Sequence, residues 1–265
     1  MEQVIQIDRL KELTKPMADQ LPKSAQGLER HRRIGRIIDN QTEETRLELT
    51  EILRDYLLEM KSNEASDIDL GGPGCNGRVW YRVHGDKSPA KMNGHVMSLV
   101  ETDFLLHNIL MPDQRQHLLD NKNLDFSHSI ELNNGTSQRF RADMYFDLEH
   151  LALNMRKIEN EIRPFRELNL HPEIAKALSL KYYKYGLTLV TGITGSGKSS
   201  TLDTIIDANN RSVDSHIVII ASPVELIHEP KRSVIRHREV GRDVSSFKAG
   251  AVQALRQDPD IIVSW

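Results

Sequence analysis

Residues 192–199 form the strongest chemical pattern in this sequence. The run matches G-x-x-x-x-G-K-[ST], the pattern of a phosphate-binding loop, and consists of Gly192, Ile193, Thr194, Gly195, Ser196, Gly197, Lys198 and Ser199. Glycines let successive backbone N–H groups point at phosphate oxygens, and the partial positive charge at the start of a following helix favours the same anion. We therefore expect this loop to bind a nucleoside triphosphate.

Two side chains of the loop have expected roles in this site. Lys198 is the residue that reaches the β- and γ-phosphates in such loops, and the hydroxyl of Ser199 is the residue that ligates Mg²⁺. Ser200, which follows directly, completes the expected nucleotide-binding set. The sequence thus predicts a site for a nucleotide together with Mg²⁺.

The elements around the loop fit that role. Residues 187–191 form a short apolar run that predicts a buried parallel strand, and a helix is expected from about Lys198. A strand at 217–221, a helix at 245–257 and a last strand at 261–263 continue an alternation of strands and helices. We therefore expect an α/β domain over residues 181–265.

The chain before this domain shows two patterns. Residues 1–62 are rich in charge and predict helices, one of which has apolar residues at steps of three and four: Leu49, Ile52, Leu53, Tyr56, Leu57 and Met60. That stripe packs either within the chain or on another subunit. Residues 63–158 predict a small α+β domain, with a helix at 97–111, strands at 79–83, 124–130, 140–146 and 151–158, and a turn at Asn133, Asn134 and Gly135. Residues 159–180 are expected to be the linker.

Composition restricts the class of protein. The 265 residues are 38% hydrophobic and 28% charged, with a formal net charge of -3, which fits a globular protein and predicts no nucleic-acid partner. Cys75 is the only cysteine, so an internal disulfide is excluded. No run approaches the ~20 apolar residues of a membrane span. We expect a cytoplasmic protein that touches a membrane only through partners.

Several runs resemble the hexameric traffic ATPases of type II secretion, type IV pili and type IV secretion. Those in the C-terminal half are residues 192–200, 216–225 and 238–260; those upstream are residues 65–70, 82–86, 124–127 and 139–141, which look like the family's N-terminal PAS-like domain. The resemblance implies a P-loop NTPase of α/β, RecA-like fold with an incomplete sheet, preceded by a small α+β PAS-like domain. It also implies ATP with Mg²⁺ as cofactors, a homo-hexamer, and inner-membrane secretion or pilus platform proteins as partners.

The resemblance also implies roles for residues outside the loop. The family's acidic segment reads approximately E-D-P-[IV]-E, and here Ala221, Ser222, Pro223, Val224 and Glu225 stand in that place. Glu225 is the retained acid and the candidate for positioning the attacking water or the metal, together with Lys198 as a catalytic residue; the alternative is a solvated loop glutamate. Arg139, Arg141 and Arg156 fall where the family supplies arginines to the nucleotide, although Arg139 and Arg141 also fit a solvent-facing pair on one strand.

The chain departs from the family pattern at its end. After Ile261, Ile262 and Val263, where a Gly-Glu pair is expected in the Walker B strand, the chain has Ser264 and Trp265. The resemblance therefore implies a truncated motor ATPase that couples ATP hydrolysis to pilus retraction, pilus assembly or secretion. The alternative is a non-hydrolysing nucleotide-binding or regulatory subunit that joins intact ATPase subunits. A metabolic kinase is disfavoured by the upstream match.

Overall fold

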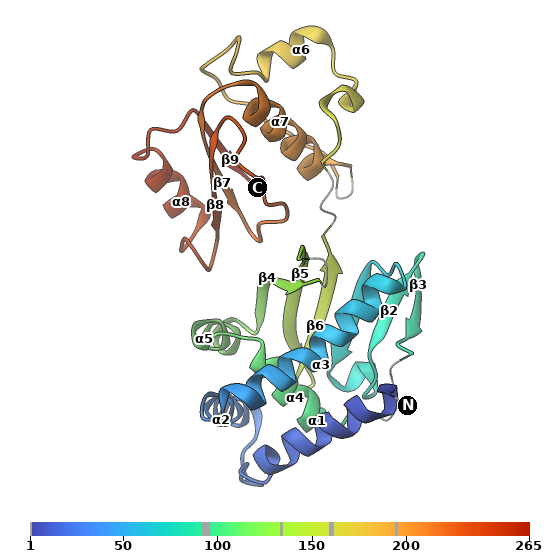
Figure 1. The fold of residues 1–265 in the computed structure, drawn as a ribbon. Helices are drawn as coiled ribbons and strands as arrows, with labels where there is room; N and C mark the ends of the chain where they lie inside the picture. Colours follow the sequence, from blue (N-terminus) through green and yellow to red (C-terminus); the bar gives the residue numbers. More distant parts are fainter. Residues whose placement is uncertain (1, 92–95, 133–134, 159–161, 194–195) are drawn as a thin grey trace. The chain divides into compact units, whose positions relative to one another are not determined.

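The computed structural model of the chain describes residues 2–91, 96–132, 135–158, 162–193 and 196–265. These residues divide into two units, Met1–Lys157 (unit 1) and Ile158–Trp265 (unit 2), which Figure 1 draws in blue to green and in yellow to red. The predicted turn residues Asn133 and Asn134 lie outside the described part of the chain.

Unit 1 has five described helices: α1 (Glu2–Ala18), α2 (Gly27–Asp39), α3 (Glu43–Ser62), α4 (Leu99–Asn108) and α5 (Pro112–Asn121). The predicted helical character of the first 62 residues is confirmed by α1 to α3. Side-chain caps start two of the helices, because Thr42 accepts a hydrogen bond from the backbone N–H of Thr45 before α3, and Ser98 and Glu101 form a capping box before α4. The predicted helix at 97–111 is α4, and α5 follows it directly.

The sheet of unit 1 has six antiparallel strands in the order β3-β2-β1-β6-β5-β4. The strands are β1 (Asp67–Gly71), β2 (Trp80–Val83), β3 (Asp86–Pro89), β4 (Asn123–Glu131), β5 (Ser137–Asp147) and β6 (His150–Lys157), with a 3₁₀ turn η1 (Pro73–Cys75) after β1. The predicted strands in this region are confirmed. Strand β3 was not predicted, because its four residues are polar or proline; in the structure all four are exposed.

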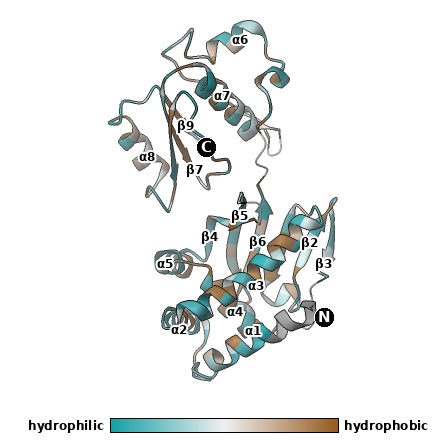
Figure 2. Ribbon diagram, viewed as in Figure 1, coloured by the Kyte–Doolittle hydropathy of each residue, from teal (hydrophilic) through white to brown (hydrophobic). Residues whose placement is uncertain are grey.

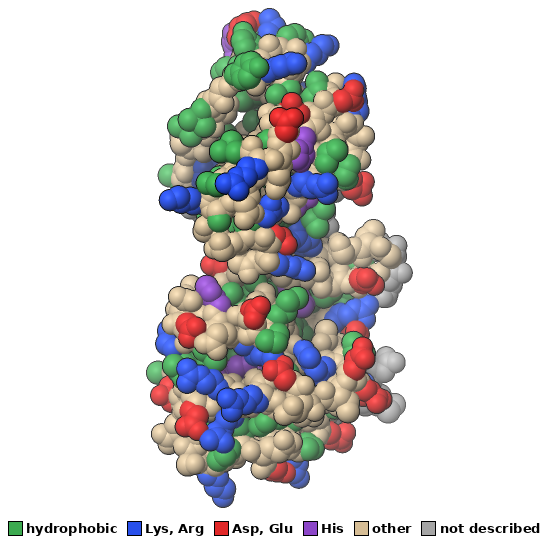
Figure 3. Space-filling model, turned by 90° about the vertical axis from the view of Figure 1, so that its left-hand side faces the viewer, with side chains coloured by type: hydrophobic (Ala, Val, Ile, Leu, Met, Phe, Trp, Pro, Cys, Tyr) green, Lys and Arg blue, Asp and Glu red, His purple; other side chains and the backbone are tan. Residues whose placement is uncertain are grey.

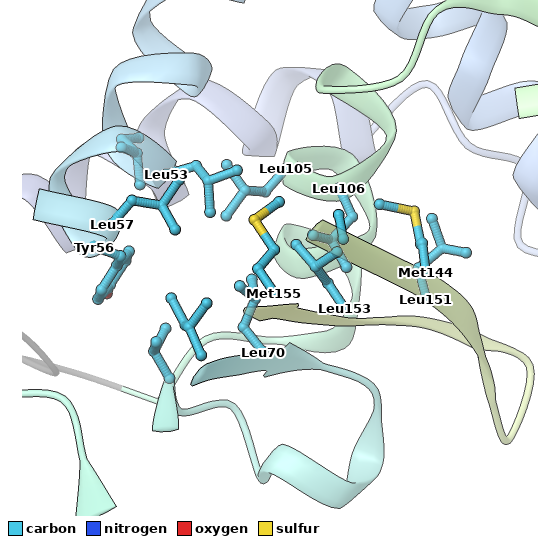
Figure 4. Close-up of a cluster of buried hydrophobic side chains, with 14 of the residues drawn as sticks. Leu53, Tyr56, Leu57, Leu70, Leu105, Leu106, Met144, Leu151, Leu153 and Met155 are labelled. Carbon is cyan, nitrogen blue, oxygen red and sulfur yellow. The ribbon is translucent and has the colours of Figure 1, made fainter. Parts of the chain in front are cut away.

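Helices α3 and α4 pack on one face of this sheet and form the main core. Figure 4 shows Leu53 and Leu57 of α3 and Leu105 and Leu106 of α4 pointing at Leu70, Leu151, Leu153 and Met155 of the strands. The stripe predicted on α3 is fully buried here, so its packing within the chain is confirmed. Figure 2 shows these hydrophobic positions in brown on α3 and α4.

Unit 2 is built around three parallel strands in the order β8-β7-β9. They are β7 (His216–Ala221), β8 (Val234–Glu239) and β9 (Ile261–Ser264), accompanied by α6 (Pro172–Ala177), α7 (Lys198–Ser212), α8 (Phe247–Ala254) and the 3₁₀ turn η2 (Phe165–Leu168). The predicted strands at 217–221 and 261–263 and the helices from Lys198 and near 245–257 are therefore confirmed. The five residues of β7 that follow His216 are buried, as expected for a central parallel strand.

The predicted buried strand at 187–191 is wrong in this chain. These residues have no strand conformation, and the side chains of Leu187 and Leu189 are 85% and 77% exposed. Among the described residues, β7 has β8 on one side and β9 on the other, and no strand lies beside residues 187–191 to share a hydrogen-bond ladder. An apolar run without a ladder partner has neither backbone hydrogen bonds nor burial to hold it extended.

The surface mixes both signs of charge. On the face drawn in Figure 3, Lys and Arg side chains are interspersed with Asp and Glu side chains. Within the described residues, no helix combines the length and the apolar character needed to cross a bilayer.

Candidate nucleotide site

The phosphate loop leads directly into helix α7. Gly197 is the N-cap of α7 and has φ 87° and ψ 18°, a left-handed conformation that glycine adopts without steric cost. The first hydrogen bond of the helix joins the N–H of Thr201 to the carbonyl of Gly197 at 2.9 Å. The N–H groups of Lys198, Ser199 and Ser200 precede that bond, so they are the donors that a helix start offers to an anion.

The glycines of the loop fit a cradle in which the backbone approaches a ligand closely. A Cβ atom on Gly192 would lie 2.5 Å from Oγ of Ser196, so a larger residue there would require the Ser196 side chain to move. At Gly197, by contrast, no described atom lies within 4 Å of the Cβ position, so the requirement for glycine there comes from φ alone. The left-handed conformation of Gly197 fits a loop whose successive backbone N–H groups face an anion.

Lys198 lies back over the loop. Its Nζ donates a hydrogen bond to the carbonyl oxygen of Ile193 at 2.9 Å, and both Lys198 and Ser199 are half-buried. Ile193, Ser196 and Ser200 are exposed, while the predicted site residues Thr194 and Gly195 lie outside the described residues. The chemistry of the donors fits Mg-ATP: Lys198 would hold phosphate oxygens, and the Ser199 hydroxyl would hold the metal, which polarises the phosphoryl group when bound.

Glu225 lies in the loop that follows β7. It is half-buried, and its loop is fixed on both sides of it by side chains of β8. The N–H of Val224 donates to Oε2 of Glu239 at 3.0 Å, and the N–H of His228 donates to Nε2 of His237 at 3.0 Å. Glu225 was predicted from the sequence, whereas Glu239 and His237, which hold its loop, were not.

Helix α7 itself binds the end of that loop through three buried polar residues. Oδ1 of Asp203 lies 3.0 Å from Nε2 of His228, and Asp207 accepts a hydrogen bond from Nζ of Lys231 at 2.6 Å. Asn210 donates to the carbonyl of Glu229 at 2.8 Å. The spacing of Asp203 and Asp207, four and eight residues after Ser199, was a signal in the sequence, because it places carboxylates on one helical face.

The ion pairs around Asp207 set its charge state. Burial alone would raise the pKa of Asp207, but hydrogen bonds from Lys231 and Arg211 act in the opposite direction and lower that pKa below its ordinary value. Asp207 therefore stays ionised at neutral pH, and its contact with Lys231 is a charge-assisted hydrogen bond.

The three candidate arginines lie in unit 1 on neighbouring strands. Arg141 of β5 and Arg156 of β6 are direct cross-strand partners, and Arg139 precedes Arg141 on the same face of β5. Nε of Arg156 donates to the buried Asp67 at 2.8 Å, and Arg141 lies 3.7 Å from Asp125. Arg139 is buried, so the alternative of a solvent-facing pair does not describe it.

The chain is similar to ATPases of pili and secretion systems. The family model for type II/IV secretion system proteins matches residues 43–264. The type IV pilus ATPase PilU of Pseudomonas aeruginosa is 34% identical over 182 residues, covering 65% of this chain and 45% of PilU. The type IV pilus retraction ATPase PilT of the same organism is 34% identical over 182 residues, covering 69% of this chain and 50% of PilT.

Solved structures show the same likeness. The crystal structure of the pilus retraction motor PilT with bound ADP matches with a TM-score of 0.67 and 31% identity, over 79% of this chain and 58% of that one. The ATPase DotB of Legionella pneumophila matches with a TM-score of 0.69 and 25% identity, over 80% and 58% of the two chains. The chain spans about half the length of the curated relatives described here. From the extent of the family match and its agreement with these relatives, the chain belongs to the type II/IV secretion system protein family.

Proposed function

We propose that this chain binds Mg-ATP at residues 192–200 and is the nucleotide-binding part of a motor ATPase for pilus retraction, pilus assembly or protein secretion. The observation on which the proposal depends is the loop before α7, where Gly197 has a left-handed conformation and Lys198 closes over the carbonyl of Ile193. The relationship to PilU and PilT supports ATP as the nucleotide.

In the proposed site each residue has one task. The N–H groups at the start of α7 and the ammonium group of Lys198 bind phosphate oxygens, which stabilises the negative charge that develops on the transferred phosphoryl group. The hydroxyl of Ser199 orients the metal. Glu225, held in the loop after β7, orients the attacking water or a metal-bound water by accepting a hydrogen bond.

The assembly and location are part of the same proposal. Arg139, Arg141 and Arg156 would approach the nucleotide from the PAS-like N-terminal unit of a neighbouring subunit in a homo-hexamer, and closure of subunits around the γ-phosphate would produce the mechanical step. The motor would work in the cytoplasm, peripheral to the inner membrane, on secretion or pilus platform proteins. The proposal includes no nucleic-acid partner, since the chain has a formal net charge of -3.

Nucleotide titration of the full chain tests the site. We expect Lys198→Ala to abolish Mg-ATP binding, because the lysine is the cationic side chain of the loop, and we expect Lys248→Ala, an exposed position on α8, to leave binding unchanged. Equal binding by the wild type and Lys198→Ala would refute the site. Phosphate release measured on the same samples separates a motor from a nucleotide-binding module.

One observation favours the second candidate function, a non-hydrolysing subunit that joins intact ATPase subunits. Leu187 and Leu189 are exposed beside the phosphate loop, in a segment that pairs with no described strand. Exposed apolar residues at this density are typical of a surface that another chain covers. Mg-ATP binding without phosphate release, together with co-elution with an intact family ATPase on a sizing column, would support this role over the motor.

A further inference from the structure

One face of helix α7 is fastened to residues 228–232 along most of its length. Asp203, Asp207 and Asn210 recur at steps of four and three residues, and each contacts a different part of that segment. Asn210 also accepts the N–H of Lys231 at its Oδ1 and the N–H of Arg232 at its backbone carbonyl, both at 2.9 Å. The helix that starts at the phosphate loop is therefore held by several polar contacts to the loop that contains Glu225.

The contact nearest to the candidate chemistry is the one between Asp203 and His228. Asp203 lies one helical turn after Ser199, and His228 lies three residues after Glu225. Asp203 is 8% exposed and His228 is 2% exposed, and their polar atoms are 3.0 Å apart. This contact is thus a short physical link between the residue expected to hold the metal and the acid expected to act beside it.

The tautomer of His228 follows from its neighbours. Because Nε2 faces a carboxylate oxygen, Nε2 bears a proton and donates, and the backbone N–H of the same residue donates to Nε2 of His237. Nδ1 of His228 is buried and has no hydrogen-bond partner among the described residues. Burying a carboxylate and an imidazole costs desolvation free energy that an apolar pair of similar volume would avoid. Packing alone therefore does not explain why these two polar side chains occupy this position.

We propose that Asp203 and His228 are positioning residues that fix the loop of Glu225 against the helix of Ser199, so that Glu225 meets the metal and water of a bound nucleotide. The proposal rests on the proposed function at residues 192–200. His237 and Glu239 of β8 hold the same loop from its other side, so the loop is fixed between α7 and β8. Neither Asp203 nor His228 touches the nucleotide itself in this proposal.

The test measures how strongly Mg²⁺ improves ATP binding to the full chain, as the ratio of the ATP Kd with EDTA to the ATP Kd with Mg²⁺. We expect His228→Leu to reduce this ratio about 10-fold, as loss of an outer-shell partner commonly does, with little change in the Kd measured in EDTA. His228→Gln, whose amide can still donate to Asp203, should recover most of the ratio. His171→Leu, an exposed histidine before α6, is the matched control and should behave as wild type.

A double-mutant cycle identifies Glu225 as the group through which His228 acts. In a Glu225→Gln background, His228→Leu should have no further effect on the ratio, because the two residues act in series. Additive effects, or an unchanged ratio in a folded His228→Leu chain, would overturn the proposal. If His228→Leu does not fold, Asp203→Leu, which has a similar shape but no acceptor for His228, replaces it with the same expectations, and Asp203→Asn, whose amide oxygen can still accept from Nε2 of His228, replaces His228→Gln.

The phosphate site and the positioning role can be refuted separately. If ATP binding by the wild type does not depend on Lys198, the proposed function itself is refuted. If binding depends on Lys198 but the Mg²⁺ ratio is insensitive to Asp203 and His228, the phosphate site stands and only the positioning role is refuted.

Discussion

The substitution Gly197→Ala tests whether the phosphate loop needs a residue that adopts a left-handed backbone conformation at this position. Gly197 has φ 87°, and no described atom lies within 4 Å of its Cβ position, so a methyl group there meets no steric barrier except that of its own backbone. A non-glycine residue in the left-handed region costs ~1–2 kcal/mol. If the loop of the variant keeps this conformation without nucleotide, the cost lowers the free energy of unfolding. If the loop relaxes without nucleotide, the cost is met on binding and lowers the affinity for ATP.

A second glycine in unit 2 provides the matched control. Gly241 has φ 86° and likewise no described atom within 4 Å of its Cβ position, but it lies in the turn between Val240 and Val244. Gly241→Ala should therefore cost the same ~1–2 kcal/mol entirely as stability, a fall of about 4–8 °C in Tm per kcal/mol for a domain of roughly 100 residues. Its affinity for ATP should not change.

Two measurements on each variant decide the question: Tm without nucleotide and the Kd for ATP by fluorescence titration. For Gly197→Ala the losses of stability and of binding free energy should sum to ~1–2 kcal/mol, so a loss expressed wholly in binding would weaken the Kd about 5- to 30-fold. Gly197→Asn should lose less, because asparagine tolerates the left-handed region better than alanine. A Gly197→Ala chain with unchanged Tm and Kd, or an equal loss of affinity in Gly241→Ala, would refute the reasoning.

Three further predictions concern unit 1. Leu53→Ala empties a fully buried position of α3 and should lower the free energy of unfolding by ~2–5 kcal/mol in a urea titration, without changing the Kd for ATP. Arg156→Met removes the 2.8 Å hydrogen bond to buried Asp67, which keeps a hydrogen bond from Ser66; because the Arg156 side chain is 68% exposed, we expect a cost of ~1 kcal/mol in the same titration. Arg141→Met breaks a 3.7 Å pair with exposed Asp125 and should cost less than ~0.5 kcal/mol; equal costs would contradict the structural role of Arg156. Burial lowers the pKa of His128 to about 4, so the free energy of unfolding should be highest above about pH 6.5 and fall by up to ~3 kcal/mol as the pH drops from about 6.5 to about 4, because in that range only the unfolded state binds the proton. His128→Gln should flatten this slope in unfolding curves measured at pH 7 and pH 5.

Local patterns in the sequence were sufficient for most elements. The stripe from Leu49 to Met60 predicted a buried helical face, and the alternation along β5 predicted a strand, because both periodicities are fixed by backbone geometry. The run at 187–191 has equally strong strand character and is not a strand, because a strand needs a neighbour and no described strand lies beside it. The strand β3 shows the opposite case, since pairing with β2 makes a strand of four residues with no apolar pattern.

The sequence by itself predicted the phosphate-binding loop, because G-x-x-x-x-G-K-[ST] combines glycine backbone freedom, a cation and a hydroxyl within eight neighbouring residues. The family came from the resemblance of several runs along the chain, and the family match over residues 43–264 confirms it. The sequence also named Glu225 through the resemblance. Only the tertiary structure decided that Asp203 meets His228 and Asp207 meets Lys231, and that Arg156 binds Asp67. These contacts join residues about 24 to 89 positions apart in the chain, and a pairing over such distances depends on how helices and strands pack, which no local pattern specifies.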